Sequence, residues 1–343
     1  MESKIKTIKI ELGERSYEIV LGCGLLERAN EYFTLDRKAL IVTDSGVPKE
    51  YSERIASLCK EAKIVTFEEG EKNKNIDTFA YICKEMLTFN LQRKDAVVAV
   101  GGGVVGDIAG FAAAAYMRGI DFYNVPTTLL SMVDSSVGGK TAIDFFGTKN
   151  ILGAFHQPRG VLIDTDVLKT LDKRQFSSGL AEVVKMSLTS DSELFSLLEG
   201  GLWKTDIAEI IARALMIKTR VVEADEKEGS LRKILNFGHT FGHGIEASSD
   251  LYHGECVALG MLPMSSEKVR KRLIPLLRDM NLPTEIKVDT ATAFKFMHHD
   301  KKGDGEGADA VFVDEVGSFR MEKTPFNTLE QIILDYLAYA KNN

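Results

Sequence analysis

Hydrophobic residues in the first half of the chain form short continuous runs that alternate with longer stretches of helical spacing. Runs rich in β-branched residues predict strands over residues 16–21, 39–43, 62–67, 96–100 and 123–125. Segments 47–60 and 76–87 carry apolar residues at helical spacing. Because strands that alternate with helices form parallel sheets covered by helices, this half predicts an α/β fold.

Beyond about residue 160 the apolar spacing becomes mostly helical. Helices are predicted over residues 176–198, 207–222, 253–269 and 329–340. The remaining strand signals, at 310–313 and 318–322 around Gly317, predict a small hairpin. We therefore expect a Rossmann-like parallel-sheet domain over residues 1–160, followed by a mostly α-helical domain over residues 161–343.

Composition and charge narrow the class of protein. The chain has 343 residues, of which 44% are hydrophobic and 27% charged, as in an ordinary globular protein. Its formal net charge of -7 argues against a nucleic-acid partner, because phosphate backbones select basic surfaces. No apolar run has the length of a membrane span or the form of a signal peptide, so we expect a cytoplasmic protein without a membrane partner.

A glycine turn follows the strand predicted over 96–100. Gly102 and Gly103 open a helix of small residues, where backbone N–H groups and the helix dipole favour a phosphate. The alternative is a tight crossover that binds nothing. Asp44, at the end of an earlier strand, is either a ribose ligand or a turn aspartate. Glu71 and Lys74 follow the third strand and by themselves indicate only a charged loop.

A dense polar segment lies between the two predicted domains. Its tetrapeptide GGKT is not a phosphate-binding P-loop, because Asp134 stands where that motif needs its first glycine. We interpret Lys140, Lys149 and Asn150 as donors to a phosphate or carboxylate of a small molecule. The alternative, a solvated basic loop, is weakened by the apolar residues that flank the segment.

Three of the six histidines fall within a glycine-rich run, as His239, His243 and His253. Glycine beside them would let a ligand or another backbone approach closely. Upstream, Glu182 and Lys185 share an apolar helix and point the same way, which favours a buried pair. Glu182, His239 and His253 would give a metal ion three ligands and leave one position open. His243 would then be available for proton transfer, and the alternative is a set of core histidines bonded to backbone.

Further polar residues precede the histidine run. Arg232 and Asn236 stand seven and three residues before His239, so all three are expected on one helical face. Lys218 and the acidic stretch 223–228 come just before them.

Taken in order, these segments resemble the 3-dehydroquinate synthase family. The resemblance runs from about Val42 to Lys302, and its strongest parts are GGGVVGDIAGF, VPTTLLSMVDSSVGGKTAID, KNILGAFHQP, GLAEVVK, LNFGHTFGH and HGECVALGM. It departs at Glu69, where the family usually has proline, and in HGEC, where the family has HGEA. The resemblance implies an NAD-binding α/β domain, a helical domain that holds zinc or cobalt, and a homodimer.

The resemblance also assigns residues. Glu182, His239 and His253 match metal ligands. The positions that match NAD contacts are Asp44, Glu71, Lys74, Gly102, Gly103, Asp107, Thr127, Thr128, Lys149 and Thr170. The positions that match substrate contacts or catalytic groups are Arg118, Asp134, Lys140, Asn150, Lys185, Lys218, Arg232, Asn236 and His243, with either Lys301 or Lys302. Arg118 would reach the neighbouring subunit's site, and Glu228 matches a proton acceptor.

The implied reaction is a step of the shikimate pathway to chorismate and the aromatic amino acids. A lyase would convert 3-deoxy-D-arabino-heptulosonate 7-phosphate to 3-dehydroquinate and phosphate, with NAD taking and then returning one hydride. Lys140, Asn150, Arg232 and His243 would hold the phosphate, and Lys185 would orient the substrate. The alternatives are another sugar phosphate cyclase, an NAD- and metal-dependent polyol dehydrogenase, and a non-catalytic nucleotide sensor.

Overall fold

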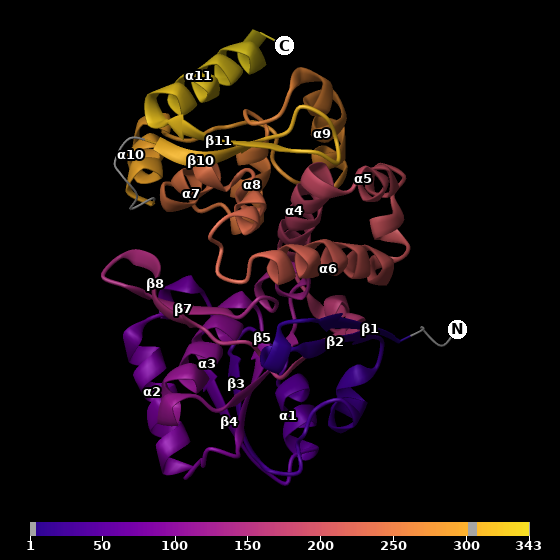
Figure 1. Cartoon of the computed structure of the whole chain (residues 1–343), viewed down its shortest axis with the longest axis vertical. Helices are drawn as coiled ribbons and strands as arrows, with labels where there is room; N and C mark the ends of the chain where they lie inside the picture. The colour runs from indigo at the N-terminus through magenta and orange to yellow at the C-terminus, as the bar shows by residue number, and fades with distance from the viewer. Residues whose placement is uncertain (1–4, 301–306, 343) are drawn as a thin grey trace. The chain divides into compact units, whose positions relative to one another are not determined.

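The structure, a computed structural model, describes residues 5–300 and 307–342. The chain divides into two compact units, Met1–Leu171 and Asp172–Asn343 (Figure 1). The boundary expected at residue 160 falls at the start of β9 (Gly160–Asp164). This strand pairs in parallel with two strands of unit 1 and so belongs to that unit, which extends to Leu171. Lys301 and Lys302, of which one was expected to contact substrate, lie outside the described residues.

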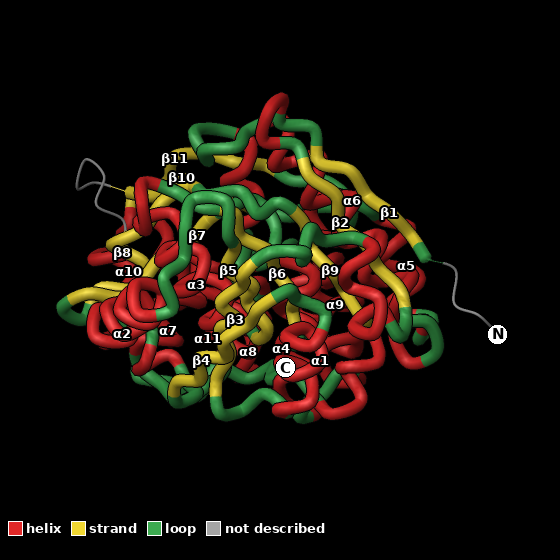
Figure 2. The backbone as a smooth tube through the Cα atoms, turned by 90° about the horizontal axis from the view of Figure 1, so that it is seen from below, coloured by secondary structure: helices red, strands yellow, loops and turns green. Residues whose placement is uncertain are grey.

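Unit 1 is built on a seven-stranded sheet in the order β1-β2-β9-β6-β5-β3-β4, as Figure 2 shows. Its other strands are β1 (Lys6–Ile10), β2 (Tyr17–Gly22), β3 (Lys38–Asp44), β4 (Glu61–Phe67), β5 (Ala96–Gly101) and β6 (Asp121–Pro126). Only β1 runs antiparallel to its neighbour. Every residue of β5 and β9 is buried, which accounts for their continuous apolar runs. The predicted parallel α/β fold is confirmed, although β1 and β9 were not predicted.

Helices α1 (Lys49–Ser57), α2 (Ile76–Thr88) and α3 (Gly103–Ala115) connect these strands. The helix expected over 47–60 is shorter at both ends, since α1 begins after its N-cap Pro48 and ends at Ser57. The small residues of α3 let it pack closely against β5 and β6. A Cβ added to Gly110, for example, would lie 3.1 Å from the Phe122 ring.

The polar segment after residue 139 forms a hairpin that the sequence did not predict. Its strands β7 (Lys140–Phe145) and β8 (Thr148–Phe155) pair antiparallel in a separate two-stranded sheet. Lys140 therefore begins a strand and not the helix that follows a P-loop, which confirms that GGKT is not this motif.

Unit 2 is mostly helical, as expected. Its elements are α4 (Lys173–Ser190), α5 (Ser192–Glu199), α6 (Ile207–Ala224), α7 (His239–Ala247), α8 (His253–Met261), α9 (Glu267–Asp279), α10 (Thr290–Asp300), the antiparallel pair β10 (Gly307–Phe312) and β11 (Arg320–Pro325), and α11 (Phe326–Asn342). The helices expected over 176–198 and 253–269 are each two helices. Asp191 and Ser266 are the N-caps of the second helices, since their side chains accept backbone N–H groups of α5 and α9.

Helices α4, α7 and α8 pack against one another, with α8 in contact with both of the others. The glycines near the histidine run were expected to let a ligand or another backbone approach closely. In the structure, the backbones of α7 and α8 approach each other there. A Cβ on Gly242 of α7 would lie 3.0 Å from Cys256 O, and one on Gly260 of α8 would lie 1.9 Å from Gly238 O. Within residues 5–300 and 307–342, the helices lack the length and apolarity needed to cross a membrane.

Candidate functional site

Three helices of unit 2 bring a carboxylate and two imidazoles together. Glu182 lies on α4, and His239 and His253 are the first residues of α7 and α8. Glu182 Oε1 stands 3.7 Å from His239 Nε2 and 3.6 Å from His253 Nε2. All three residues offer donor atoms close enough to share one metal ion.

The spacing and burial of these donors fit a divalent ion. Tetrahedral zinc, with ligand bonds of about 2.0–2.2 Å, holds neighbouring donor atoms roughly 3.3–3.5 Å apart. The observed spacings are slightly longer than this and too long for hydrogen bonds. Glu182 is fully buried, and its Oε1 accepts no hydrogen bond among the described residues. A buried carboxylate oxygen is costly without a donor or a cation, so a metal would satisfy it.

Each imidazole is oriented by a contact to its other nitrogen. His239 Nδ1 lies 3.1 Å from the carbonyl oxygen of Phe237, and His253 Nδ1 lies 3.1 Å from Glu246 Oε2. With an N–H on Nδ1, each ring would offer its Nε2 lone pair to an ion placed between that nitrogen and Glu182. Sequence reasoning missed Glu246, although its place on the helix of His239 and His243 was a usable signal.

Charge at the centre is balanced by Lys185. Its ammonium pairs with Glu182 Oε2, and both side chains are buried, as predicted for this couple. Burial alone would raise the pKa of Glu182, but Lys185 and the two imidazoles hold it well below its usual range. Burial and Lys185 hold the pKa of His239 well below its usual range, which leaves a neutral ring. Burial opposes the charged form of His253, yet contacts with Glu182 and Glu246 raise its pKa to about 10.

His243 lies beside the centre on the same helix as His239. Their ring centroids are 5.2 Å apart, and the His243 ring is 6.0 Å from that of His253. The prediction that residues 239 and 243 share a helical face is confirmed.

The expectation that Arg232, Asn236 and His239 share one helical face is wrong. A 3₁₀ helix, Leu231–Asn236, ends before α7 begins, and Gly238 separates them with a φ of 77°. Gly238 is tightly enclosed there, because a Cβ would lie 2.7 Å from Met261 Cγ. The chain therefore turns between these residues instead of continuing as a single helix.

The loop before this 3₁₀ helix is organised by Asp225. Its carboxylate accepts hydrogen bonds from the backbone N–H groups of Gly229, Ser230 and Arg232, at 2.9, 2.7 and 3.0 Å. Sequence reasoning did not single out Asp225. The loop also orients predicted site residues, since Asn236 Nδ2 donates to Glu228 Oε1 at 3.0 Å.

Two predicted cations of unit 2 are buried. Arg232, 2% exposed, donates through Nη1 to the carbonyl oxygen of Glu226 at 2.5 Å. Lys218 is buried on α6. Burial of long cationic side chains is expensive, so both positions are consistent with a role in holding an anion.

Unit 1 gathers three of the predicted residues around a fourth, Lys74. Its Nζ lies 2.6 Å from Asp107 Oδ2, 2.5 Å from Asn150 Oδ1 and 3.7 Å from Glu71 Oε1. Burial would lower the pKa of Lys74, but the surrounding carboxylates raise it to about 12. Three positions expected to contact NAD and one expected to contact substrate thus form one polar cluster.

Other predicted residues follow the carboxyl ends of neighbouring strands. Asp44 ends β3, Gly102 follows β5, and Thr127 follows β6. The chain leaves β3 for β4 on one side and returns to β5 on the other, which makes a topological switch point. Ligands of open α/β sheets bind at such points. Asp44 also accepts the N–H of Gly46 at 2.9 Å, so the turn contact considered for it exists.

The remaining predicted residues lie in several different elements of unit 1. Thr170 Oγ1 lies 2.9 Å from the hydroxyl of Tyr51, and Thr128 Oγ1 accepts the N–H of Ser131 at 3.2 Å. Arg118 and Lys149 are exposed, Lys140 begins β7, Gly103 begins α3, and Asp134 lies in the helical turn Ser131–Ser135.

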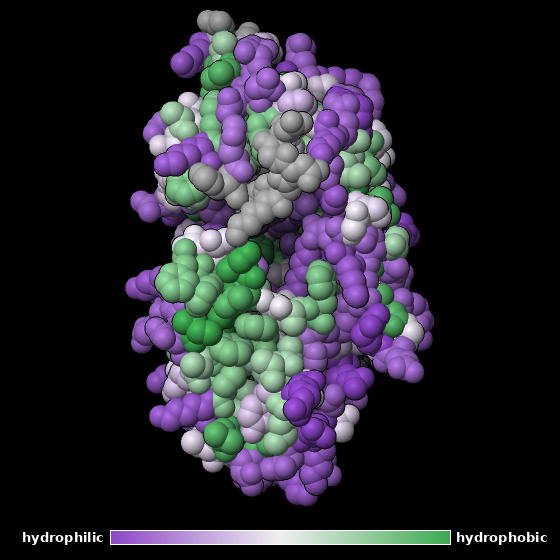
Figure 3. Space-filling view, turned by 60° about the vertical axis from the view of Figure 1, so that its left-hand side comes forward, coloured by the Kyte–Doolittle hydropathy of each residue, from purple (hydrophilic) through white to green (hydrophobic). Residues whose placement is uncertain are grey.

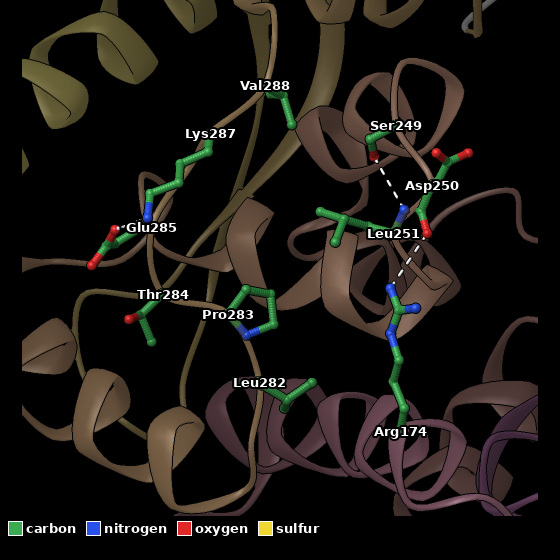
Figure 4. A pocket seen from close by; sticks show the side chains of 10 residues that line it. All are labelled: Arg174, Ser249, Asp250, Leu251, Leu282, Pro283, Thr284, Glu285, Lys287 and Val288. Carbon is green, nitrogen blue, oxygen red and sulfur yellow. Dashed lines mark hydrogen bonds and ion pairs between the residues drawn. The ribbon is translucent and has the colours of Figure 1, made fainter.

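A pocket of about 690 Å³ lies elsewhere on unit 2 (Figure 4). It is lined by Arg174, Ser249, Asp250, Leu251, Leu282, Pro283, Thr284, Glu285, Lys287 and Val288. Arg174 donates twice to Glu255 at 2.7 Å, stacks 4.1 Å from the Tyr252 ring and reaches Asp250 O at 3.3 Å. These contacts hold in place the residues on either side of His253, from Asp250 to Glu255.

Comparisons with known proteins identify relatives along most of the chain. The family models described as 3-dehydroquinate synthase N-terminal and 3-dehydroquinate synthase C-terminal match residues 64–178 and 179–303. The chain is 42% identical over 334 residues to the 3-dehydroquinate synthase of Halorhodospira halophila, covering 91% of this chain and 94% of the relative. It is 44% identical over 289 residues to that of Caulobacter vibrioides, covering 79% of this chain and 78% of the relative.

Solved structures with the same fold are also similar. A 2-deoxy-scyllo-inosose synthase complexed with carbaglucose-6-phosphate, NAD+ and Co2+ has a TM-score of 0.87 and 26% identity, covering 96% of this chain and 100% of its own. A 2-epi-5-epi-valiolone synthase from Streptomyces hygroscopicus with NAD+ and Zn2+ bound has a TM-score of 0.84 and 29% identity, covering 97% and 99%. Through both family models and these relatives, the chain belongs to the 3-dehydroquinate synthase family.

Proposed function

We propose that this chain is a 3-dehydroquinate synthase, a lyase that converts 3-deoxy-D-arabino-heptulosonate 7-phosphate to 3-dehydroquinate and phosphate. The observation that carries the proposal is the triad of Glu182, His239 and His253, with its fully buried carboxylate, in a chain of this family. The alternative cyclases are represented by structures at 26% and 29% identity, below the 42% and 44% of the named synthases. The reaction belongs to biosynthesis, which favours a cytoplasmic enzyme.

The cofactors of the proposal are NAD and a divalent ion, zinc or cobalt. When bound, NAD would accept and return a hydride, and the ion would act as a Lewis acid on substrate oxygens. Glu182, His239 and His253 would hold the ion. NAD would be held by Asp44, Glu71, Lys74, Gly102, Gly103, Asp107, Thr127, Thr128, Lys149 and Thr170. The switch point between β3 and β5 and the Lys74 cluster support this assignment.

The proposed roles in unit 2 follow from charge and contact. Arg232 and Lys218 are buried cations suited to a phosphate or carboxylate. Glu228 is the proposed proton acceptor, and Asn236 orients it by donating to Oε1. His243 would move a proton beside the metal centre, and Lys185 would orient the substrate while neutralising Glu182.

Further contacts to the substrate are proposed for residues outside this loop and helix pair. From unit 1 they are Arg118, Asp134, Lys140 and Asn150. One of Lys301 and Lys302 completes the set. The proposed substrate, 3-deoxy-D-arabino-heptulosonate 7-phosphate, carries a phosphate and a carboxylate, and the cationic and amide groups of this set are suited to both.

We further propose that the enzyme is a homodimer in which Arg118 serves the partner's site. Figure 3 shows hydrophobic side chains gathered on one face of unit 1, on the side of α2 and the β7–β8 hairpin. Phe146, Ile151 and Phe155 of this hairpin are 92%, 44% and 48% exposed, and Met117, beside Arg118, is 39% exposed. Exposed apolar groups of this size favour a protein–protein contact.

The decisive experiment incubates the purified chain with 3-deoxy-D-arabino-heptulosonate 7-phosphate, catalytic NAD and zinc. Phosphate and 3-dehydroquinate are expected in equal amounts, without net NADH, and a chelator should abolish both. NADH that accumulates without phosphate would instead identify a polyol dehydrogenase. Phosphate released only from a different sugar phosphate would identify another cyclase. If the chain binds NAD but releases no product from any of these substrates, the result would support a non-catalytic nucleotide sensor.

A further inference from the structure

His253 lies between two carboxylates, one at each ring nitrogen. Its Nε2 faces Glu182 Oε1 at 3.6 Å, and its Nδ1 lies 3.1 Å from Glu246 Oε2. Glu246 comes from α7, whereas His253 begins α8, so the contact also joins two helices of unit 2. The Glu246 side chain is 17% exposed, which shields the contact from much of the solvent.

The contact has a definite chemical consequence for a ligand imidazole. A carboxylate is an acceptor only, so when an ion lies between Nε2 and Glu182 the ring keeps its proton on Nδ1, facing Glu246, and gives its Nε2 lone pair to the ion. A carboxylate also makes the ring a stronger donor to a metal than a neutral acceptor does. His239 has such a neutral acceptor, the carbonyl oxygen of Phe237. The two imidazoles of the triad are therefore supported by different partners.

We propose that Glu246 is a positioning residue of the metal centre, which fixes the tautomer and the orientation of His253 and strengthens its bond to the ion. The inference rests on the metal centre of the proposed function and adds a residue to it.

A competing role exists for Glu246, because donor atoms of His243, Glu246 and His253 also lie close enough to share an ion. In that arrangement Glu246 would be a ligand and His253 would bind through Nδ1. The burial of the donors favours the first arrangement, since Glu182 is fully buried with an Oε1 that accepts no hydrogen bond among the described residues. Glu246, by contrast, already has a hydrogen-bond partner in His253.

The test measures zinc affinity and stoichiometry by competition with a chromophoric chelator, in the full chain without substrate. Glu246→Ala should keep one ion per chain but bind it about 10–100-fold more weakly, as is typical when such a support is removed. Glu246→Gln should lose less, because its amide oxygen still accepts the Nδ1 proton. In the cobalt form, Glu246→Ala should shift the visible absorption bands, which a purely structural role would leave unchanged.

The matched control is Glu199→Ala, which removes a carboxylate paired with Arg272 in the same unit at 2.6 Å. It should lower the melting temperature without weakening zinc binding. Unchanged zinc affinity and cobalt bands in Glu246→Ala would overturn the inference, as would two ions in the parent and one in the variant. A parent chain that binds no divalent ion would instead overturn the proposed metal centre itself.

Discussion

Gly254 on α8 lies so close to Ser178 on α4 that an added Cβ would stand 2.0 Å from the Ser178 carbonyl oxygen. The N–H of Gly254 also donates to Ser178 Oγ at 3.0 Å. Gly254 directly follows His253, and Ser178 lies about one turn before Glu182. The close approach of these two backbones therefore sets the spacing between a carboxylate and an imidazole of the metal centre.

Gly254→Ala should therefore displace the proposed ligand His253, which is the preceding residue. The new methyl group must push α8 away from α4, at a cost of about 1–3 kcal/mol in the free energy of unfolding. Zinc binding should weaken at the same time, as measured by chelator competition. Gly200→Ala is the control, because its Cβ meets only ordinary contacts at 3.5 Å. Equal zinc affinity in Gly254→Ala and the parent would contradict this account.

His253→Ala should lose zinc and turnover while leaving unit 1 folded. Loss of the metal removes several kcal/mol of charge stabilisation, so the rate should fall by about 10³-fold or more. Metal content and phosphate release measure the two effects, and retained NAD binding reports the fold of unit 1. His298→Ala, which removes an exposed histidine paired with Glu330, should behave as the parent. Full activity of the His253 variant after chelation would refute the ligand assignment.

Lys74→Met, compared with a double variant, tests whether Lys74 binds NAD or only stabilises the fold of unit 1. Removing the cation leaves the Asp107 carboxylate uncompensated in a partly buried place, at a cost of about 3 kcal/mol. The double variant K74M/D107N removes that carboxylate charge and should regain most of the stability in urea unfolding. NAD affinity, measured by calorimetry, should stay low in both variants. A double variant that binds NAD like the parent would show that the pair is only structural.

Asp225 makes the loop that carries Glu228 and Arg232 sensitive to acid. Hydrogen bonds from the N–H groups of Arg232, Ser230 and Gly229 lower the pKa of Asp225 to about 2. Since an unfolded aspartate titrates near about 3.9, this contribution to stability is complete above about pH 4 and is lost as the pH falls towards 2. The difference in unfolding free energy between the parent and Asp225→Asn should therefore narrow over that range. A difference that is constant with pH would contradict the assigned cause.

Charges on the exposed face of the β7–β8 hairpin should dissociate the proposed dimer. Ile151→Asp and Phe155→Asp each place a carboxylate where an apolar contact is proposed, which is strongly unfavourable once desolvated. Sedimentation should then show monomers, and turnover should fall because Arg118 no longer reaches the partner's site. Leu334→Asp, at an exposed leucine of α11 with a similar exposure of 45%, should leave the oligomeric state unchanged. If both hairpin variants dimerise with the same affinity as the parent, this face is not the dimer interface.

The central strands of unit 1 were predictable because each carries a continuous apolar run. Residues 96–100 are buried on both faces, and a run this short and rich in valine is typical of a strand inside a parallel sheet. Strand β1 and the β7–β8 hairpin are partly exposed and mix polar with apolar residues, so they lack such a continuous run. The starts of α5 and α9 are marked by capping hydrogen bonds to Asp191 and Ser266, which the spacing of apolar residues does not show.

The sequence by itself determined which residue types were available for chemistry: the histidine run, the buried Glu182–Lys185 couple and the glycine turn after β5. Only the tertiary structure decided which nitrogen of each histidine faces Glu182, that Glu246 supports His253, and that Gly238 turns the chain before α7. Residue spacing within one helix follows from its fixed pitch and is visible in a sequence. Distances between α4, α7 and α8 depend on how closely their glycines let the backbones approach, and that is a property of packing.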